Sequence, residues 1–222
     1  MLPLAERLRP KTLKEYIGQK HLVGEGAILR QMIENGNLSS FILWGPPGVG
    51  KTTLARIIAH ELERPFYTLS AVTSGVKEVR EVIEKAKRFV SINSGLFSAS
   101  SGQENRSPIL FIDEIHRFSK SQQDSLLGAV EEGTITLIGA TTENPSFEVI
   151  TPLLSRCQVY VLKSLEKADL QELLQRALTE DAHICSLGID MKETESILRY
   201  SGGDARKLLN IVELVTNSGV KV

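Results

Sequence analysis

The chain has 222 residues, and its 26 Lys and Arg against 27 Asp and Glu give a formal net charge of −1. This balance excludes a uniformly basic nucleic-acid coat protein and a polyacidic tail protein, but it leaves room for a local basic patch. Hydrophobic residues make up 41% of the chain, enough for a sizeable core, and two cysteines are too few for a disulfide framework. Because no apolar run approaches about 20 residues, we expect no membrane span and a cytoplasmic location.

Short apolar runs alternate with longer amphipathic stretches along the first three quarters of the chain. The spacing of apolar residues over 52–62 and over 76–90 predicts helices. Strands that alternate with helices indicate parallel pairing through right-handed crossovers. We therefore expect an α/β fold with a five-stranded parallel sheet flanked by helices, its strands at 41–44, 66–69, 109–112, 135–138 and 159–162.

Two later features of the sequence predict a loop within the α/β domain and the end of that domain. Residues 91–107 include six Ser and two Gly without any period, which predicts an exposed, mobile loop. After Leu162 the strand pattern stops, and apolar residues follow at helical spacing. The sequence thus predicts an α/β domain at 1–163 and a small all-helical domain at 164–222.

The strongest functional signal is the segment GPPGVGKT, which matches the P-loop spacing G-x-x-x-x-G-K-[ST]. A strand is predicted before it and a helix after it, and both flanks argue against the alternative, a glycine-rich turn of the same spacing. Glycines let backbone N–H groups converge on phosphate oxygens, Lys51 can reach the β- and γ-phosphates, and the Thr52 hydroxyl can ligate Mg²⁺. The residues expected to bind nucleotide here are Gly45, Pro46, Pro47, Gly48, Val49, Gly50, Lys51, Thr52 and Thr53.

Two carboxylates, Asp113 and Glu114, follow the apolar run 109–112. Ligand sites in open α/β sheets lie at the carboxyl ends of the strands. We therefore expect Asp113 to hold Mg²⁺ through water and Glu114 to polarise the water that attacks the γ-phosphate. The alternative is a solvated acidic turn. His116 is expected to be a surface or supporting residue.

These two motifs and four segments in order resemble the AAA+ ATPases, and more narrowly the clamp-loader-related RarA family, which includes the Mgs and Werner-helicase-interacting ATPases. The segments are 8–19, 111–124, 138–147 and 154–157. The resemblance covers nearly the whole chain and implies ATP hydrolysis with Mg²⁺ at stalled replication forks, gaps or DNA ends, in replication-associated recombination and repair. It also implies single-strand DNA-binding protein as a partner and a homo-oligomer, a tetramer in full-length members.

The resemblance assigns roles to further polar residues. Thr142, with Asn144 as second candidate, matches sensor 1, which contacts the γ-phosphate or the attacking water; on the residues alone, a turn cap is the alternative. Arg156 matches the arginine finger that acts on the ATP of a neighbouring subunit. Arg206 matches sensor 2, which contacts the γ-phosphate within its own subunit; a helix-start ion pair is the alternative.

The resemblance also implies an adenine-binding segment near the N-terminus, formed by Arg9, Pro10, Tyr16, Ile17 and Gly18, with Ile17 and Gly18 as its wall. It further implies that 164–222 is the lid of the nucleotide site. Because full-length members continue into a helical oligomerisation region, we expect this lid to be incomplete at Val222.

The residues themselves support DNA binding only weakly. Basic residues of the predicted helix 76–90 are interleaved with Glu, which first indicates a solvated helix. The alternatives to the proposed class are a clamp-loader subunit of the replication factor C type, a nucleotide-gated binding module with little hydrolysis, and a P-loop kinase for small molecules. Candidate contacts to DNA phosphates are Lys85, Lys87, Arg88, Arg106, Arg117 and Lys120.

Overall fold

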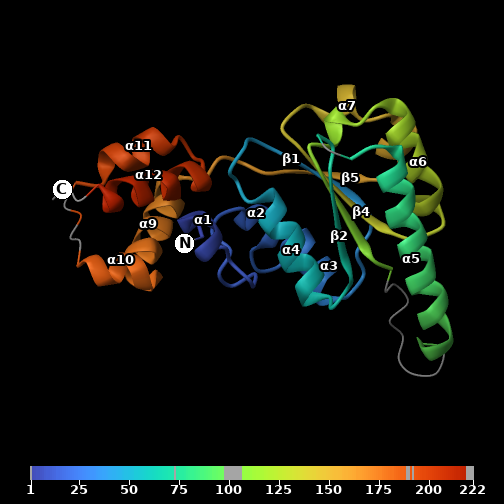
Figure 1. Cartoon of the computed structure of the whole chain (residues 1–222), viewed down its shortest axis with the longest axis horizontal. Coiled ribbons are helices and arrows are strands. Elements are labelled where there is room, and N and C mark those ends of the chain that lie inside the picture. Colours follow the sequence, from blue (N-terminus) through green and yellow to red (C-terminus); the bar gives the residue numbers. More distant parts are fainter. Residues whose placement is uncertain (1, 73, 98–106, 189–190, 192, 219–222) are drawn as a thin grey trace.

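A computed structural model describes residues 2–72, 74–97, 107–188, 191 and 193–218. In this part of the chain five parallel strands form one sheet in the order β2-β3-β4-β1-β5, which confirms the predicted α/β sheet (Figure 1). Since β4 lies between β1 and β3, the carboxyl ends of β1 and β3 are separated by one strand. The strands are β1 (Phe41–Trp44), β2 (Phe66–Ser70), β3 (Ile109–Asp113), β4 (Thr136–Thr141) and β5 (Gln158–Val161).

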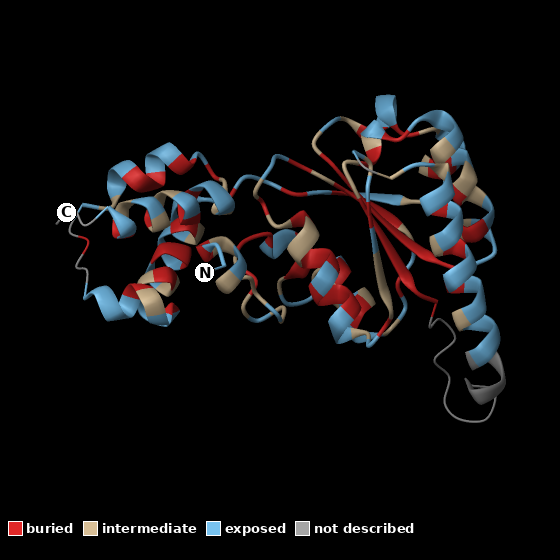
Figure 2. Ribbon diagram, in the orientation of Figure 1, coloured by how far each residue is buried: buried red, intermediate tan, exposed pale blue. Residues whose placement is uncertain are grey.

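The strands form because their alternate side chains enter two hydrophobic clusters on opposite faces of the sheet. Phe41 and Leu43 enter one cluster with the helix after β1, whereas Ile42 between them enters the other. The central strands are therefore buried on both sides, as Figure 2 shows by their colour. Burying one such side chain stabilises the fold by about 1.5–3 kcal/mol.

Helices cover both faces of the sheet (Figure 1). One face carries α2 (Lys20–Val23), α3 (Ile28–Glu34) and α4 (Lys51–Glu61), and the other carries α5 (Val76–Phe97) and α6 (Lys120–Glu131). The short elements η1 (Ile115–Arg117), α7 (Pro145–Glu148) and α8 (Thr151–Leu154) follow strands β3 and β4.

Helix α5 is longer than predicted and includes part of the segment 91–107, which was expected to be a loop. It continues to Phe97, so the prediction of a loop is wrong for residues 91–97, while 98–106 lie outside the described residues. An established helix extends at the gain of about one hydrogen bond per residue, and no proline interrupts 91–97. The Ser-rich composition therefore did not stop the helix.

The remaining helices form a separate hydrophobic cluster beside the sheet. This cluster joins α9 (Lys167–Glu180), α10 (Ala182–Leu187), α11 (Glu195–Ser201) and α12 (Ala205–Asn217). Leu4 and Leu8 of the N-terminal segment, which includes α1 (Leu4–Arg7), also belong to it. Although α1 precedes the α/β part in sequence, it thus packs against the helical domain.

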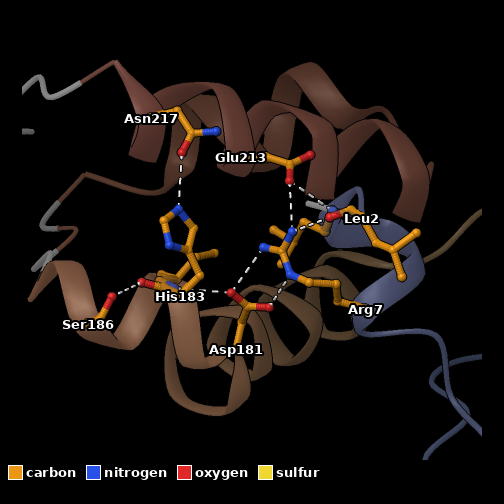
Figure 3. A network of polar contacts seen from close by, with 9 residues as sticks. Leu2, Arg7, Asp181, His183, Ser186, Glu213 and Asn217 are labelled. Carbon is orange, nitrogen blue, oxygen red and sulfur yellow. Dashed lines mark hydrogen bonds and ion pairs between the residues drawn. The ribbon is translucent and has the colours of Figure 1, made fainter.

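A charged network at this junction holds α1 in place (Figure 3). The Arg7 guanidinium donates from Nε to Asp181 Oδ2 at 2.7 Å, from Nη2 to Asp181 Oδ1 at 3.0 Å and from Nη1 to Glu213 Oε1 at 3.1 Å. Asp181 also caps α10 by accepting from the Ile184 amide at 3.1 Å.

In the described part of the chain, none of the helices has the length and apolarity needed to cross a membrane.

Candidate functional site

One cavity brings together residues from five distant parts of the sequence. It lies where the N-terminal segment, the loop after β1, the end of β3, α9 with Leu165 before it, and the start of α12 meet. Of the residues predicted from the sequence, those that line it are Arg9, Pro10, Ile17, Pro47, Gly48, Val49, Gly50, Lys51, Thr52, Thr53, Asp113, Glu114 and Arg206. The predicted residues outside the lining are Gly18, Gly45, Pro46, Thr142, Asn144 and Arg156.

The loop between β1 and α4 has the backbone of a phosphate-binding loop. Gly48 and Gly50 have φ angles of +69° and +95°, in the left-handed region that a side chain would disfavour. Gly50 is the N-cap of α4, so the helix begins at Lys51. The first N–H groups of a helix lack partners within the helix and carry its positive dipole end, and here they border the cavity.

Lys51 is buried within this loop. Its Nζ donates hydrogen bonds to the carbonyl oxygens of Gly45 and Pro46, at 2.7 and 2.8 Å. Burial lowers the pKa of Lys51, whereas the nearby carboxylates of Glu114 and Asp113 act to raise it. The ammonium group thus lies among electronegative oxygens, close to both acids at the end of β3.

Glu114 has an unusual backbone and a specific partner. Its φ of +56° and ψ of +46° place a residue other than glycine in the left-handed region, which costs about 1–3 kcal/mol. Its Oε2 lies 3.3 Å from Nε2 of His116. The Nδ1 of the same ring lies 3.0 Å from the hydroxyl of Thr141, at the end of β4. The carboxylate that borders the cavity is therefore connected to the neighbouring strand.

The structure separates the sensor 1 candidates. Thr142 is half-buried and does not line the cavity, and the Asn144 Oδ1 accepts from the Ser146 amide at 3.0 Å as the N-cap of α7. Thr141, which the sequence did not single out, has the hydroxyl that reaches Glu114 through His116. β4 ends at Thr141, so Thr142 lies beyond the strand, and the motif alone does not say where the strand ends.

The N-terminal wall of the cavity is held by polar contacts to the loop and to α4. Arg9 donates from Nη1 to the Thr53 hydroxyl at 3.2 Å and pairs with Glu6. Gly18 instead packs against the helical domain, because a Cβ on it would stand 2.5 Å from Leu165 Cδ2.

Tyr16, expected in the adenine-binding segment, has a supporting contact with the loop that the sequence did not predict. Its hydroxyl donates to the Val49 carbonyl at 3.2 Å beneath the phosphate loop, and burial raises its pKa. A Cβ on Gly50 would stand 2.6 Å from this hydroxyl. The position of Tyr16 in the expected adenine segment did not indicate this contact with the loop.

The two arginines with predicted roles are in different places. Arg206 lines the cavity at the start of α12, and the amide of Ala205 beside it donates to the Gly48 carbonyl at 3.1 Å. Arg156 lies after α8, where it forms an ion pair with Glu131 and donates to the Pro152 carbonyl at 2.6 Å. Arg156 is thus outside the cavity of its own chain.

The candidate DNA contacts are exposed but partly paired. Lys85 and Arg88 are exposed on α5, and Lys87 lies 3.7 Å from the Glu84 carboxylate. Arg117 and Lys120 are exposed near the start of α6. Arg106 lies outside the described residues.

The chain is similar in sequence to known proteins along nearly its whole length. The chain is 49% identical to replication-associated recombination protein A of Escherichia coli (strain K12), over 97% of this chain and 46% of that protein. It is 44% identical to ATPase WRNIP1 of Dictyostelium discoideum, over 96% of this chain and 23% of that protein. The chain therefore spans about half the length, or less, of these curated relatives.

A solved structure has the same fold. The Thermotoga maritima RuvB Holliday junction branch migration motor matches with a TM-score of 0.68 and 28% identity, over 95% of this chain and 65% of that one. The model of the ATPase family associated with various cellular activities (AAA) matches residues 41–165, more than half of the 222 residues. The chain belongs to this AAA family of ATPases.

Proposed function

We propose that this chain binds ATP with Mg²⁺ in the cavity and hydrolyses it, and that the hydrolysis serves replication-associated recombination on DNA. The observation that carries the proposal is the shared lining: the loop 47–53, the acids at the end of β3 and Arg206 border the same space. Phosphoryl transfer to water needs mainly positioning and charge stabilisation, and these are the groups that supply both.

Each group has a distinct part in the proposed reaction. The loop amides and Lys51 hold the β- and γ-phosphates, while Glu114 orients the attacking water and accepts its proton. The Thr52 hydroxyl and the Asp113 carboxylate are the hard oxygen ligands that suit Mg²⁺, and both border the cavity. Mg²⁺, when bound, neutralises charge on the transferred phosphoryl group.

The helical domain is the proposed lid. Arg206 enters the cavity from α12, so contact with the γ-phosphate would link the nucleotide state to the angle between the lid and the sheet. Thr141 or Thr142 at the end of β4, or Asn144, is the proposed sensor. Arg156 is proposed to complete the site of a neighbouring copy, since it is outside its own cavity.

The experiment that tests hydrolysis compares Glu114→Gln with the wild-type chain. We expect ATP affinity, measured by calorimetry, to change by less than about threefold, while phosphate release falls by at least about 100-fold, because the amide cannot accept the proton. Glu25→Gln, at an exposed position outside the cavity, is the matched control and should leave both quantities unchanged. Equal turnover of Glu114→Gln and wild type would remove Glu114 from the mechanism.

The DNA part of the proposal rests on what the relatives are named for. The names of the Escherichia coli and Thermotoga maritima proteins refer to recombination and to branch migration. We propose forks, gaps or single-strand ends as the DNA and single-strand DNA-binding protein as a partner. ATP turnover should rise with forked or gapped DNA more than with blunt duplex; stimulation by a sliding clamp instead would favour the clamp-loader alternative.

A further inference from the structure

His116 lies between the ends of two neighbouring strands, β3 and β4. It belongs to η1, directly after the β3 acids, and 12% of its side chain is exposed. One ring nitrogen faces Glu114 Oε2 at 3.3 Å, and the other faces the Thr141 hydroxyl at 3.0 Å. The ring thus connects β3 to β4 through side chains alone.

The hydrogen-bonding roles of the neighbouring groups decide which ring nitrogen of His116 carries a proton. Nε2 of His116 lies at ion-pair distance, 3.3 Å, from Glu114 Oε2 and can donate to this carboxylate when that nitrogen carries a proton. The Thr141 hydroxyl accepts from the Glu143 amide at 3.0 Å, and its single proton goes either to the Glu143 carbonyl at 3.1 Å or to Nδ1 of His116. If Thr141 donates to Nδ1, the neutral ring carries its proton on Nε2, facing Glu114; if Thr141 donates to the Glu143 carbonyl, Nδ1 donates to Thr141, and Nε2 carries a proton as well only in the charged ring.

Both ends of this connection are held rigidly. Thr141 is fully buried and is the last residue of β4. Ile115, next to His116, is also fully buried. It packs closely on β4, since a Cβ added to Gly139 would stand 3.1 Å from the Ile115 Cδ1. The Arg117 amide donates to the Glu114 carbonyl at 2.8 Å, which closes the turn. The ring therefore has little freedom to move away from Glu114.

This contact leaves one oxygen of Glu114 for the reaction. Among the described residues, Oε2 has His116 as its partner, while the side chain as a whole borders the cavity. A contact that holds one carboxylate oxygen limits the directions in which the other oxygen presents its lone pairs. The left-handed backbone at Glu114 also turns the side chain here, so the backbone and His116 restrain it together.

We propose that His116 is a positioning residue that holds the Glu114 carboxylate in the geometry for water activation and ties it to Thr141 at the end of β4. The inference rests on the proposed function, because it assigns His116 to ATP hydrolysis. It goes beyond that function by naming a residue other than the two motif acids, and by making Thr141 rather than Thr142 the residue linked to Glu114, through His116.

Two substitutions at the same position separate this role from a merely structural one. In His116→Gln the side-chain amide nitrogen can occupy the place of Nε2, so the contact with the Glu114 carboxylate is kept and the hydrogen bond to the Thr141 hydroxyl is lost. In His116→Asn the side-chain amide can occupy the place of Nδ1, so the hydrogen bond to the Thr141 hydroxyl is kept and the contact with the Glu114 carboxylate is lost. We expect kcat to fall on the order of 10- to 100-fold in His116→Asn and less than about threefold in His116→Gln, with ATP affinity unchanged in both.

Three results decide the outcome. Equal losses in both variants together with lowered Tm would show a structural role and overturn the inference. Wild-type kcat in His116→Asn would overturn it while the proposed function stands. Absence of ATP turnover in wild type would defeat the proposed function and this inference with it. Independently of turnover, ¹⁵N NMR of the imidazole should show a protonated Nε2; a ring protonated only at Nδ1 contradicts the inference.

Discussion

The backbone of Gly48 lies directly against the carboxylate of Asp204, so that a Cβ on this glycine would stand 1.7 Å from Asp204 Oδ1. Asp204 is the N-cap of α12 and accepts from the Lys207 amide at 2.9 Å. The next amide in the chain, that of Ala205, donates to the Gly48 carbonyl at 3.1 Å. The start of α12 is therefore in direct contact with the loop between β1 and α4.

This contact predicts the result of Gly48→Ala. The new methyl group must displace α12 and must also adopt the left-handed φ of +69°. We expect a lowered Tm and ATP binding weakened by at least about tenfold in calorimetry. The control is Gly128→Ala within α6, where a Cβ meets nothing within 4 Å. Because alanine favours the helix there, this control should stabilise the chain by about 0.5–1 kcal/mol; equal destabilisation by both changes would contradict the account.

A second prediction concerns Tyr16, which supports the loop from below. Tyr16→Phe removes the hydrogen bond to the Val49 carbonyl and leaves that buried acceptor without its donor. We expect a loss of about 0.5–1.5 kcal/mol in the free energy of unfolding, measured with urea, and weaker ATP binding. Tyr200→Phe is the matched control, since that side chain is exposed and should change neither quantity. If Tyr16→Phe binds and unfolds like wild type, the phenol does not support the loop.

A third prediction follows from the Arg7–Asp181 pair between α1 and the helical domain. The Arg7 guanidinium holds the pKa of Asp181 below its usual value of 3.8. A carboxyl with a lowered pKa contributes stability that is fully present above its ordinary pKa and is lost as the pH falls through the lowered value. Asp181→Asn should therefore cost about 1.5–3 kcal/mol at pH 7, and the difference from wild type should shrink below pH 3.8.

The measurement is urea unfolding of wild type and Asp181→Asn at several pH values. Glu195→Gln is the control, because its ion pair with Lys167 is largely exposed and such pairs contribute little. A difference between wild type and Asp181→Asn that stays constant down to the lowest pH at which the chain folds would contradict the assignment. So would an equal effect of the Glu195 substitution.

The sheet and the phosphate loop were predictable because their signals are local. The runs at 41–44 and 109–112 are apolar throughout since both faces of β1 and β3 are buried, and the loop between β1 and α4 needs glycines at fixed positions. In these segments, neighbours in sequence determine the conformation. The order of strands in the sheet is also limited by the rules for parallel crossovers.

The contacts that were missed depend on residues distant in sequence. Leu4 and Leu8 pack with helices that begin more than 150 residues later, and no local pattern distinguishes that destination from the sheet. Tyr16 under the loop and Thr141 behind His116 are of the same kind. Which of two adjacent threonines contacts His116 depends on the exact end of β4, and strand ends are where sequence patterns are least accurate.

The last prediction tests whether Arg156 acts between copies of the chain. Lys51→Ala impairs a chain's own site but leaves its Arg156 intact, and Arg156→Ala does the reverse. Each variant alone should show little ATP turnover, because an arginine finger contributes about 10³–10⁵ in rate. In an equal mixture, about a quarter of head-to-tail interfaces combine an intact Lys51 with an intact Arg156 from the neighbour, so turnover should partly return. Phosphate release, measured with sedimentation of the same samples, gives both activity and assembly; an assembled mixture with no recovery would show that Arg156 does not act on a neighbour's nucleotide.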